Sequence, residues 1–202
     1  KEPYLGKDVI GATYAPHDGH VNPLLVLRAM QAGFQALGGT YRSQQSVRTI
    51  KANADGFVLD TEKGPVQVKK VILAAGLDNA RLAPMVGLEQ AIYPQRGQIL
   101  VTEKLPPMLN HPTNYLRQTQ DGTIQIGASS EQSGLDDGNT VEVMAKLAHR
   151  AKQLMPALAD QNIVRAWGAL RVLSPDGYPI YDQAPIKGAY ALSCHSAVTL
   201  AA

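Results

Sequence analysis

The chain has 202 residues, of which 45% are hydrophobic and 18% charged, and its formal net charge is +2. This composition is typical of a globular protein with one substantial core or two small ones, and the small, evenly spread charge disfavours nucleic acid as a partner. Cys194 is the single cysteine, which excludes an internal disulfide framework and a cysteine-rich metal site.

The two ends of the sequence are unusual. The chain starts at Lys1 without an initiator methionine, and its last residues, 196–202, read as the first turn of an apolar helix. A helix of one turn would leave a packing face unfinished. We therefore expect this chain to be a fragment of a longer protein.

The first third of the chain predicts a strand, a helix and a meander. Residues 9–15 predict a strand, and Asn22-Pro23 predicts the start of a helix that ends at Gly38-Gly39. Three strand candidates follow at 46–52, 56–61 and 66–69, separated by turn residues, and together they predict a β-meander. The continuously apolar run 71–76 predicts a strand buried on both faces, and a helix is expected over 80–86.

The remaining elements are mostly strands. Segments 97–104, 114–119 and 123–129 predict strands, with Asp121-Gly122 as a hairpin turn, and 140–155 predicts an amphipathic helix. The element order indicates an α+β or mixed α/β fold with two intertwined domains.

Arg171 lies in an apolar run from Trp167 to Asp182, interrupted only by a turn at 174–177. We expect a hairpin that carries this arginine. A guanidinium stays charged, so burying it is costly unless an anion accepts its donors. The residues leave two interpretations open: a structural arginine that is solvated or paired with an acidic side chain, or one that binds an anionic ligand.

Other candidate sites are weaker. His17, Asp18 and His20 have side chains that suit zinc or iron, but turn formation explains them equally well, and we predict no metal. No Gly-x-Gly-x-x-Gly nucleotide motif is present. Cys194 and His195 are neighbours and would point to opposite faces of a strand, so we do not expect a nucleophilic pair.

Six segments, taken in order, resemble the FAD-dependent D-amino-acid oxidase superfamily, and within it glycine oxidase, sarcosine oxidase and D-amino-acid dehydrogenase enzymes. They are GATYAPHDGHVNP, VILAAGLDNARLAP, YPQRGQI, NYLRQTQDGTIQIGAS, WGALRVLSPDGYPIYD and CHSAVTLAA. The resemblance covers residues 10–202. It implies a partial FAD-binding Rossmann-like domain (21–88 and 163–202) intertwined with a substrate-binding domain on an antiparallel or mixed sheet (1–20 and 89–162). The family's N-terminal Gly-rich FAD-binding motif is missing from this sequence.

The resemblance also implies site residues. Arg171 matches the arginine that binds the substrate carboxylate, Tyr115 matches a tyrosine that helps to hold it, and His195 is the third expected substrate-binding residue. The implied FAD-binding residues are Val47, Gly76, Arg96, Gly97, Gln98, His195, Ser196, Ala197, Val198, Thr199 and Leu200. At three places, Gln118-Thr119, His195 and Ala197, this sequence differs from the residues common in the family. These differences affect the prediction of the substrate more than that of the reaction type.

The function implied by the resemblance is oxidation of a small amine or amino acid, by hydride transfer from the amine-bearing carbon to FAD. The expected location is cytoplasmic. The protein could also associate with the inner face of a membrane. The resemblance leaves open whether the electrons pass to oxygen or to a membrane acceptor, and whether the protein forms a homo-oligomer. The alternative is a truncated or degenerate fragment that binds no flavin and has a binding or structural role.

Overall fold

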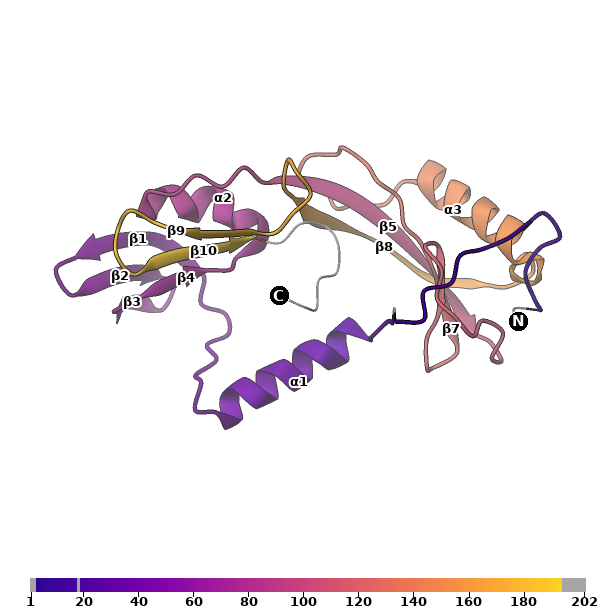
Figure 1. Ribbon diagram of the computed structural model, residues 1–202, viewed down its shortest axis with the longest axis horizontal. Helices are drawn as coiled ribbons and strands as arrows, with labels where there is room; N and C mark the ends of the chain where they lie inside the picture. The colour runs from indigo at the N-terminus through magenta and orange to yellow at the C-terminus, as the bar shows by residue number, and fades with distance from the viewer. Residues whose placement is uncertain (1–2, 18, 194–202) are drawn as a thin grey trace. The chain divides into compact units, whose positions relative to one another are not determined.

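The computed structural model describes residues 3–17 and 19–193, and Figure 1 labels the elements in chain order. The chain forms two compact units. Unit 1 comprises Lys1–Gly39 and Arg96–Leu170, and unit 2 comprises Thr40–Gln95 and Arg171–Ala202. These contact units place 21–39, 89–95 and 163–170 differently from the expected domains. The assignment of one domain to FAD and the other to substrate stays a prediction.

Unit 1 is built on a four-stranded sheet with the order β6-β7-β5-β8. Its strands are β5 (Tyr93–Lys104), β6 (Leu116–Gln118), β7 (Thr123–Ile126) and β8 (Ile163–Leu173). Helix α3 (Val141–Leu154) and the short helix η3 (Pro156–Leu158) cover one face. The core between them contains Leu100, Leu116, Ile124, Ile126, Leu147, Ala151, Met155 and Leu158.

Helix α1 (Pro23–Ala36) also belongs to unit 1. The Asn22 side-chain oxygen accepts hydrogen bonds from the backbone N–H groups of Leu24 and Leu25, at 3.0 and 3.3 Å, and Pro23 occupies the first helical position. After the C-cap, Leu37, the chain continues through Gly38 at φ +87°. The predicted helix is confirmed, although none of its residues is buried.

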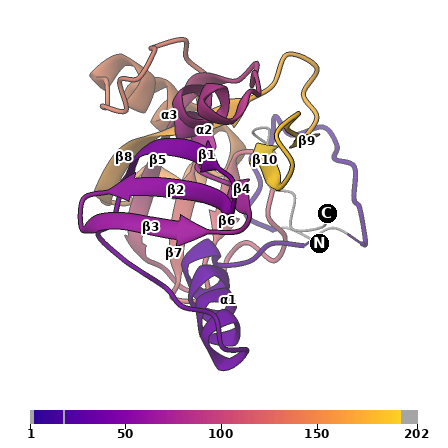
Figure 2. The ribbon, with the colours of Figure 1, turned by 90° about the vertical axis from the view of Figure 1, so that its left-hand side faces the viewer.

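Unit 2 contains two small sheets. The meander β1 (Val47–Asn53), β2 (Gly56–Thr61) and β3 (Gly64–Val68) is antiparallel, and its three strands lie side by side in Figure 2. In the second sheet β10 (Ala189–Ser193) pairs in parallel with β4 (Val71–Leu73) and antiparallel with β9 (Ile180–Gln183). Between β4 and β5 lie three short helices: η1 (Gly76–Asp78), α2 (Asn79–Leu82) and η2 (Ala83–Val86).

The predicted mixed α/β class is confirmed, but three local predictions are wrong. Residues 9–15 are irregular and mostly exposed, and a strand has no ladder to join there. The strand predicted over 71–76 ends at Leu73, and Ile72 is 62% exposed, so only one of its faces is buried. The expected hairpin does not form, because β8 pairs within the sheet of unit 1 and β9 within the second sheet of unit 2.

Candidate functional site

The carboxyl ends of the parallel strands β4 and β10 are held together by Asn79. Its side chain is fully buried; Nδ2 donates to Leu73 O (3.2 Å), Leu192 O (3.0 Å) and Ser193 Oγ (2.9 Å). Its Oδ1 accepts from Ala75 N at 3.1 Å. Ligands bind outside the carboxyl ends of strands in open α/β sheets, so this is where a cofactor would be expected in unit 2.

Two further features of this strand end suit a cofactor. Gly76 has φ +61°, a left-handed conformation that favours glycine, and a Cβ added there would lie 3.7 Å from Val172 Cγ2. Gln90 accepts a hydrogen bond from Ser193 Oγ at 2.8 Å, whereas its buried Nε2 has no partner among the described residues. An orphaned buried donor fits a polar acceptor such as a flavin carbonyl or ring nitrogen.

Arg171 is half-buried near the end of β8, next to Val172. Its neighbour Val172 lies against Gly76, but neighbouring side chains of a strand point to opposite faces, so this contact does not direct the Arg171 side chain to Gly76. Both belong to unit 2. The binding of a substrate carboxylate by Arg171 and of a cofactor by Gly76 therefore stays a prediction.

Tyr115 belongs to unit 1 and precedes β6. Its ring is 41% exposed, and Arg150 of α3 stacks on it, with Cζ 4.4 Å from the ring centroid. A cation over the face of a tyrosine restrains the ring and leaves the hydroxyl at its edge able to bind a ligand. Its contact with a substrate carboxylate stays a prediction.

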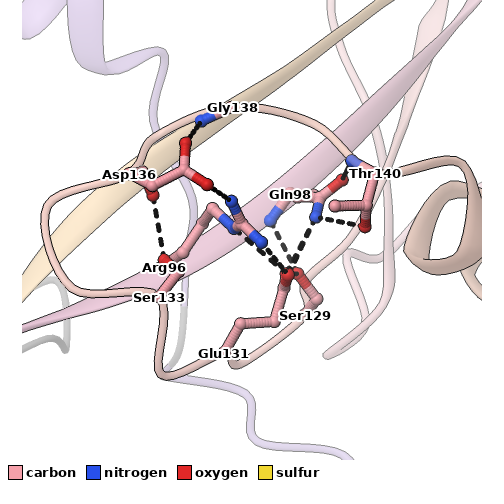
Figure 3. Close-up of polar contacts among 8 residues, drawn as sticks. All are labelled: Arg96, Gln98, Ser129, Glu131, Ser133, Asp136, Gly138 and Thr140. Atoms are coloured by element: carbon pink, nitrogen blue, oxygen red, sulfur yellow. Dashed lines mark hydrogen bonds and ion pairs between the residues drawn. The ribbon is translucent and has the colours of Figure 1, made fainter.

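Arg96 and Gln98, expected together with Gly97 to bind FAD, lie in a network of polar side chains in unit 1 (Figure 3). Arg96 donates from Nε and Nη2 to Glu131 Oε2 (3.1 and 2.7 Å) and from Nη1 to Asp136 (2.6 Å). Gln98 Nε2 donates to Glu131 and to Thr140 Oγ1, and its Oε1 accepts from Thr140 N at 3.0 Å.

These contacts shift the pKa values of the network. Burial raises the pKa of Glu131, but hydrogen bonds from Ser129, Arg96 and Gln98 lower it by more, so the net pKa lies below its usual value. The hydrogen bond to Glu131 holds the pKa of Arg96 above its usual value. The two side chains, Arg96 and Gln98, are thus committed to protein partners, and a role in binding FAD stays a prediction.

Val47, expected near the adenine, is half-buried at the start of β1. Its carbonyl oxygen accepts a hydrogen bond from Arg81 Nη2 at 3.0 Å, and the carbonyl of Arg48 accepts one from Arg81 Nη1 at 2.8 Å. The hydrogen bond from Arg81 also lowers the pKa of Asp78. Arg81 therefore fixes the backbone at the position where an adenine contact is predicted.

The remaining predicted site residues, His195, Ser196, Ala197, Val198, Thr199 and Leu200, lie outside the described residues. Among residues 3–17 and 19–193, no group of three or more histidine, cysteine, aspartate or glutamate side chains could hold a metal ion. Within the same ranges, no helix combines the length and the apolar character needed to cross a bilayer.

Two functional candidates were not recognised in the sequence. Asn79 could have been suspected as a polar residue shortly after a buried strand. Arg117 lies in the segment that carries Tyr115, and its position opposite Gln125 depends on a strand register that the sequence does not reveal.

Comparisons with known proteins agree with this geometry. The family model described as FAD dependent oxidoreductase (DAO) matches residues 1–202. An opine oxidase subunit of Agrobacterium tumefaciens (strain Ach5) is 43% identical over 98% of this chain and 54% of that protein. Glycine oxidase of Pseudomonas aeruginosa is 32% identical over 91% of this chain and 52% of that protein.

Solved structures give the same result. Glycine oxidase from Geobacillus kaustophilus superposes with a TM-score of 0.89 and 27% identity, covering 96% of this chain and 54% of that one. The chain thus spans about half the length of the relatives it matches. By sequence and by fold, the chain belongs to the D-amino-acid oxidase family of FAD-dependent oxidoreductases.

Proposed function

We propose that this chain is the part of an FAD-dependent oxidoreductase that binds the substrate and one side of the flavin, and that the full-length enzyme oxidises an amino acid at its amine-bearing carbon. The observation that carries the proposal is Arg171, half-buried near the end of β8, in the unit whose β4 strand end, at Gly76 and Gln90, suits a cofactor. A guanidinium at that point would hold a substrate carboxylate next to the cofactor.

The substrate class follows from the similarity to opine oxidase subunits, at 43 to 44% identity in two organisms. Many opines are amino acids whose amine nitrogen bears a carboxyalkyl group. We propose a secondary amine of this kind, with a primary amino acid such as glycine as the second candidate, because glycine oxidases are 32% identical or less.

The residues of this chain bind and orient. Arg171 would bind the carboxylate through two parallel hydrogen bonds, and the Tyr115 hydroxyl would donate a third, which together would fix the orientation of the α-carbon. A bound flavin would supply the acceptor for the hydride. The amine lone pair forms the C=N bond as the C–H electron pair leaves, and water then hydrolyses this imine to a carbonyl compound and an amine. An amine that arrives neutral needs no protein base for this step.

Gly76, Asn79 and Gln90 suit the flavin side of the site. Gly76 allows close approach of the backbone, Asn79 fixes the strand ends, and the Nε2 donor of Gln90 has no acceptor among the described residues. Val47, Arg96, Gly97, Gln98 and residues 195–200 complete the proposed set.

The similarity to opine oxidase also suggests how the protein assembles. The matching relative is one subunit of that enzyme and so functions with at least one other, and we propose that the full-length form of this chain does the same. A homo-oligomer is the alternative assembly. We propose a cytoplasmic location, with passage of electrons to oxygen or to an acceptor at the inner face of a membrane.

The experiment is turnover by the full-length protein, with its partner subunit if one co-purifies. The proposal predicts a yellow protein that converts an opine to a carbonyl compound and an amino acid, both detected by mass spectrometry. A colourless protein that stays colourless after addition of FAD would instead support the flavin-free alternative, in which the fold serves binding or assembly.

A further inference from the structure

Arg117 is a half-buried arginine on the face of the unit 1 sheet that is turned away from α3. Its neighbour Leu116 is buried in the core beneath α3, and side chains alternate along a strand, so Arg117 lies on the opposite face. Gln125 of β7 is directly opposite, and Val101 of β5 continues the same row. The proposed function gives the Arg117 side chain no role.

The guanidinium of Arg117 lacks a carboxylate partner among the described residues. Among the described residues, its single hydrogen bond runs from Nη1 to Gln125 Oε1 at 3.5 Å, and no described residue accepts a hydrogen bond from its buried Nε. Arg96, in contrast, is bound by two carboxylates, and Arg81 by one. An arginine with a buried and unsatisfied donor is costly to keep unless an anion binds it in the functional state.

The geometry also indicates the shape of that anion. Gln125 occupies Nη1, which leaves the edge formed by Nε and Nη2 without a partner in the described structure. Two parallel N–H groups on this edge match the two oxygens of a carboxylate. Arg117 lies two residues from Tyr115, which is proposed to contact the α-carboxylate of the substrate.

We propose that Arg117 determines specificity by binding a second carboxylate on the substrate, so that the preferred substrates are amino acids with a carboxyalkyl group on the amine nitrogen. This inference rests on the proposed function and assigns a residue to the second carboxylate of that substrate class. It also assigns Gln125 as the residue that positions the guanidinium, by holding Nη1 across the strand pair β6–β7.

The test compares two amines that differ by one carboxylate, N-methylglycine and iminodiacetate, in the full-length flavoprotein. Arg117→Gln should lower kcat/KM for iminodiacetate roughly 10- to 100-fold, the effect of a lost charge-assisted hydrogen bond, and change that for N-methylglycine by about twofold or less. Arg117→Lys should restore part of the loss, since it returns the charge without the paired donors. Arg165→Gln is the matched control, because Arg165 is exposed on β8 over the ring of Trp167.

A binding measurement separates this inference from the proposed function. Thiodiacetate and (methylthio)acetate replace the amine by sulfur, so their binding can be followed by thermal stabilisation without turnover. Weaker binding of thiodiacetate alone in Arg117→Gln supports the inference even if neither amine reduces the flavin, in which case only the proposed function fails. The inference would be overturned if Arg117→Gln weakened the binding of both ligands equally or of neither. It would also be overturned if the variant lost FAD while the ratio of the two ligand affinities stayed unchanged, because the anion bound by Arg117 would then belong to the cofactor.

Discussion

Arg171 is the residue on which the proposed chemistry depends. Replacing it with methionine in the full-length enzyme removes the paired donors for the α-carboxylate and keeps an unbranched side chain of similar length. We expect kcat/KM for an amino-acid substrate to fall by the equivalent of about 2–4 kcal/mol, the scale of a lost charge-assisted pair. Steady-state kinetics on a carboxylate-bearing amine measures this loss.

The control for Arg171→Met is Arg165→Met, on the same strand six positions earlier. The Arg165 guanidinium stacks over Trp167 at 5.2 Å from the ring centroid and has no proposed role in binding substrate. Unchanged turnover in Arg171→Met, or equal losses in the two variants, would contradict the assignment of Arg171.

Glu131 connects Arg96, Gln98 and Ser129, and its lowered pKa makes a stability prediction. A carboxylate whose pKa is lowered in the folded state makes its full contribution to the stability of the fold at pH values above its pKa in the unfolded chain, about 4.3. This contribution disappears as the pH falls through the lowered pKa of the folded state. Glu131→Gln should therefore reduce the free energy of unfolding at neutral pH by about 1–3 kcal/mol and weaken its dependence on acid pH.

Thermal unfolding of the full-length protein between about pH 7 and pH 3 tests the Glu131 prediction. Glu142→Gln is the comparison variant, because Glu142 pairs with Lys146 on the exposed face of α3 and should contribute little. If the plots of Tm against pH for wild type and Glu131→Gln ran parallel across the acid range, the partners of Glu131 would not lower its pKa as described.

At the scale of elements, the short contacts at the ends of β4 and β10 depend on Asn79. Asn79→Ala leaves four polar groups without their partner, and we expect the free energy of unfolding to fall by about 3 kcal/mol. Asn53→Ala, at an exposed position on β1, should cost about 1 kcal/mol or less. Denaturant unfolding monitored by far-UV circular dichroism compares the two; similar losses would contradict the assigned role of Asn79.

The sequence predicts those elements whose signals are local. The Asn22-Pro23 start of α1, the meander turns and the amphipathic stripe of α3 depend on neighbouring residues, and all three appear in the structure. The prediction of a hairpin around Arg171 is wrong because the alternation of apolar and polar residues within β8 and β9 does not reveal which strand each one pairs with. The partner is decided by contacts distant in sequence.

In the candidate site, too, the sequence predicts the features that depend on local signals and not those that depend on contacts distant in sequence. The segment that carries Arg171 is found by its resemblance to a family, and Gly76 by the end of an apolar strand. The network around Arg96 and the orphaned donor of Arg117 depend on cross-strand pairs and on a loop at 131–138, so spacing along the chain does not predict them.

At the scale of the whole molecule, two apolar surfaces are uncovered in the described residues. On α1 the exposed side chains include Leu24, Leu27 and Met30, and on the β4–β10–β9 sheet they include Ile72 and Tyr181. The 202-residue chain by itself should therefore bind the dye ANS and self-associate at micromolar concentration, whereas the full-length protein should not. Fluorescence and analytical ultracentrifugation measure both; a monomeric 202-residue chain that does not bind ANS would contradict this expectation.

The most direct test of the central claim is the absorption spectrum of the full-length flavoprotein, mixed without oxygen with an excess of an opine. The account predicts loss of the visible flavin bands in a single turnover, with one imine-derived carbonyl formed per flavin reduced, and a far slower loss in Arg171→Met. An oxidised spectrum that persists in the wild-type protein with opines, N-methylglycine and glycine alike would contradict the claim that this chain supplies the substrate site of an amine-oxidising flavoenzyme.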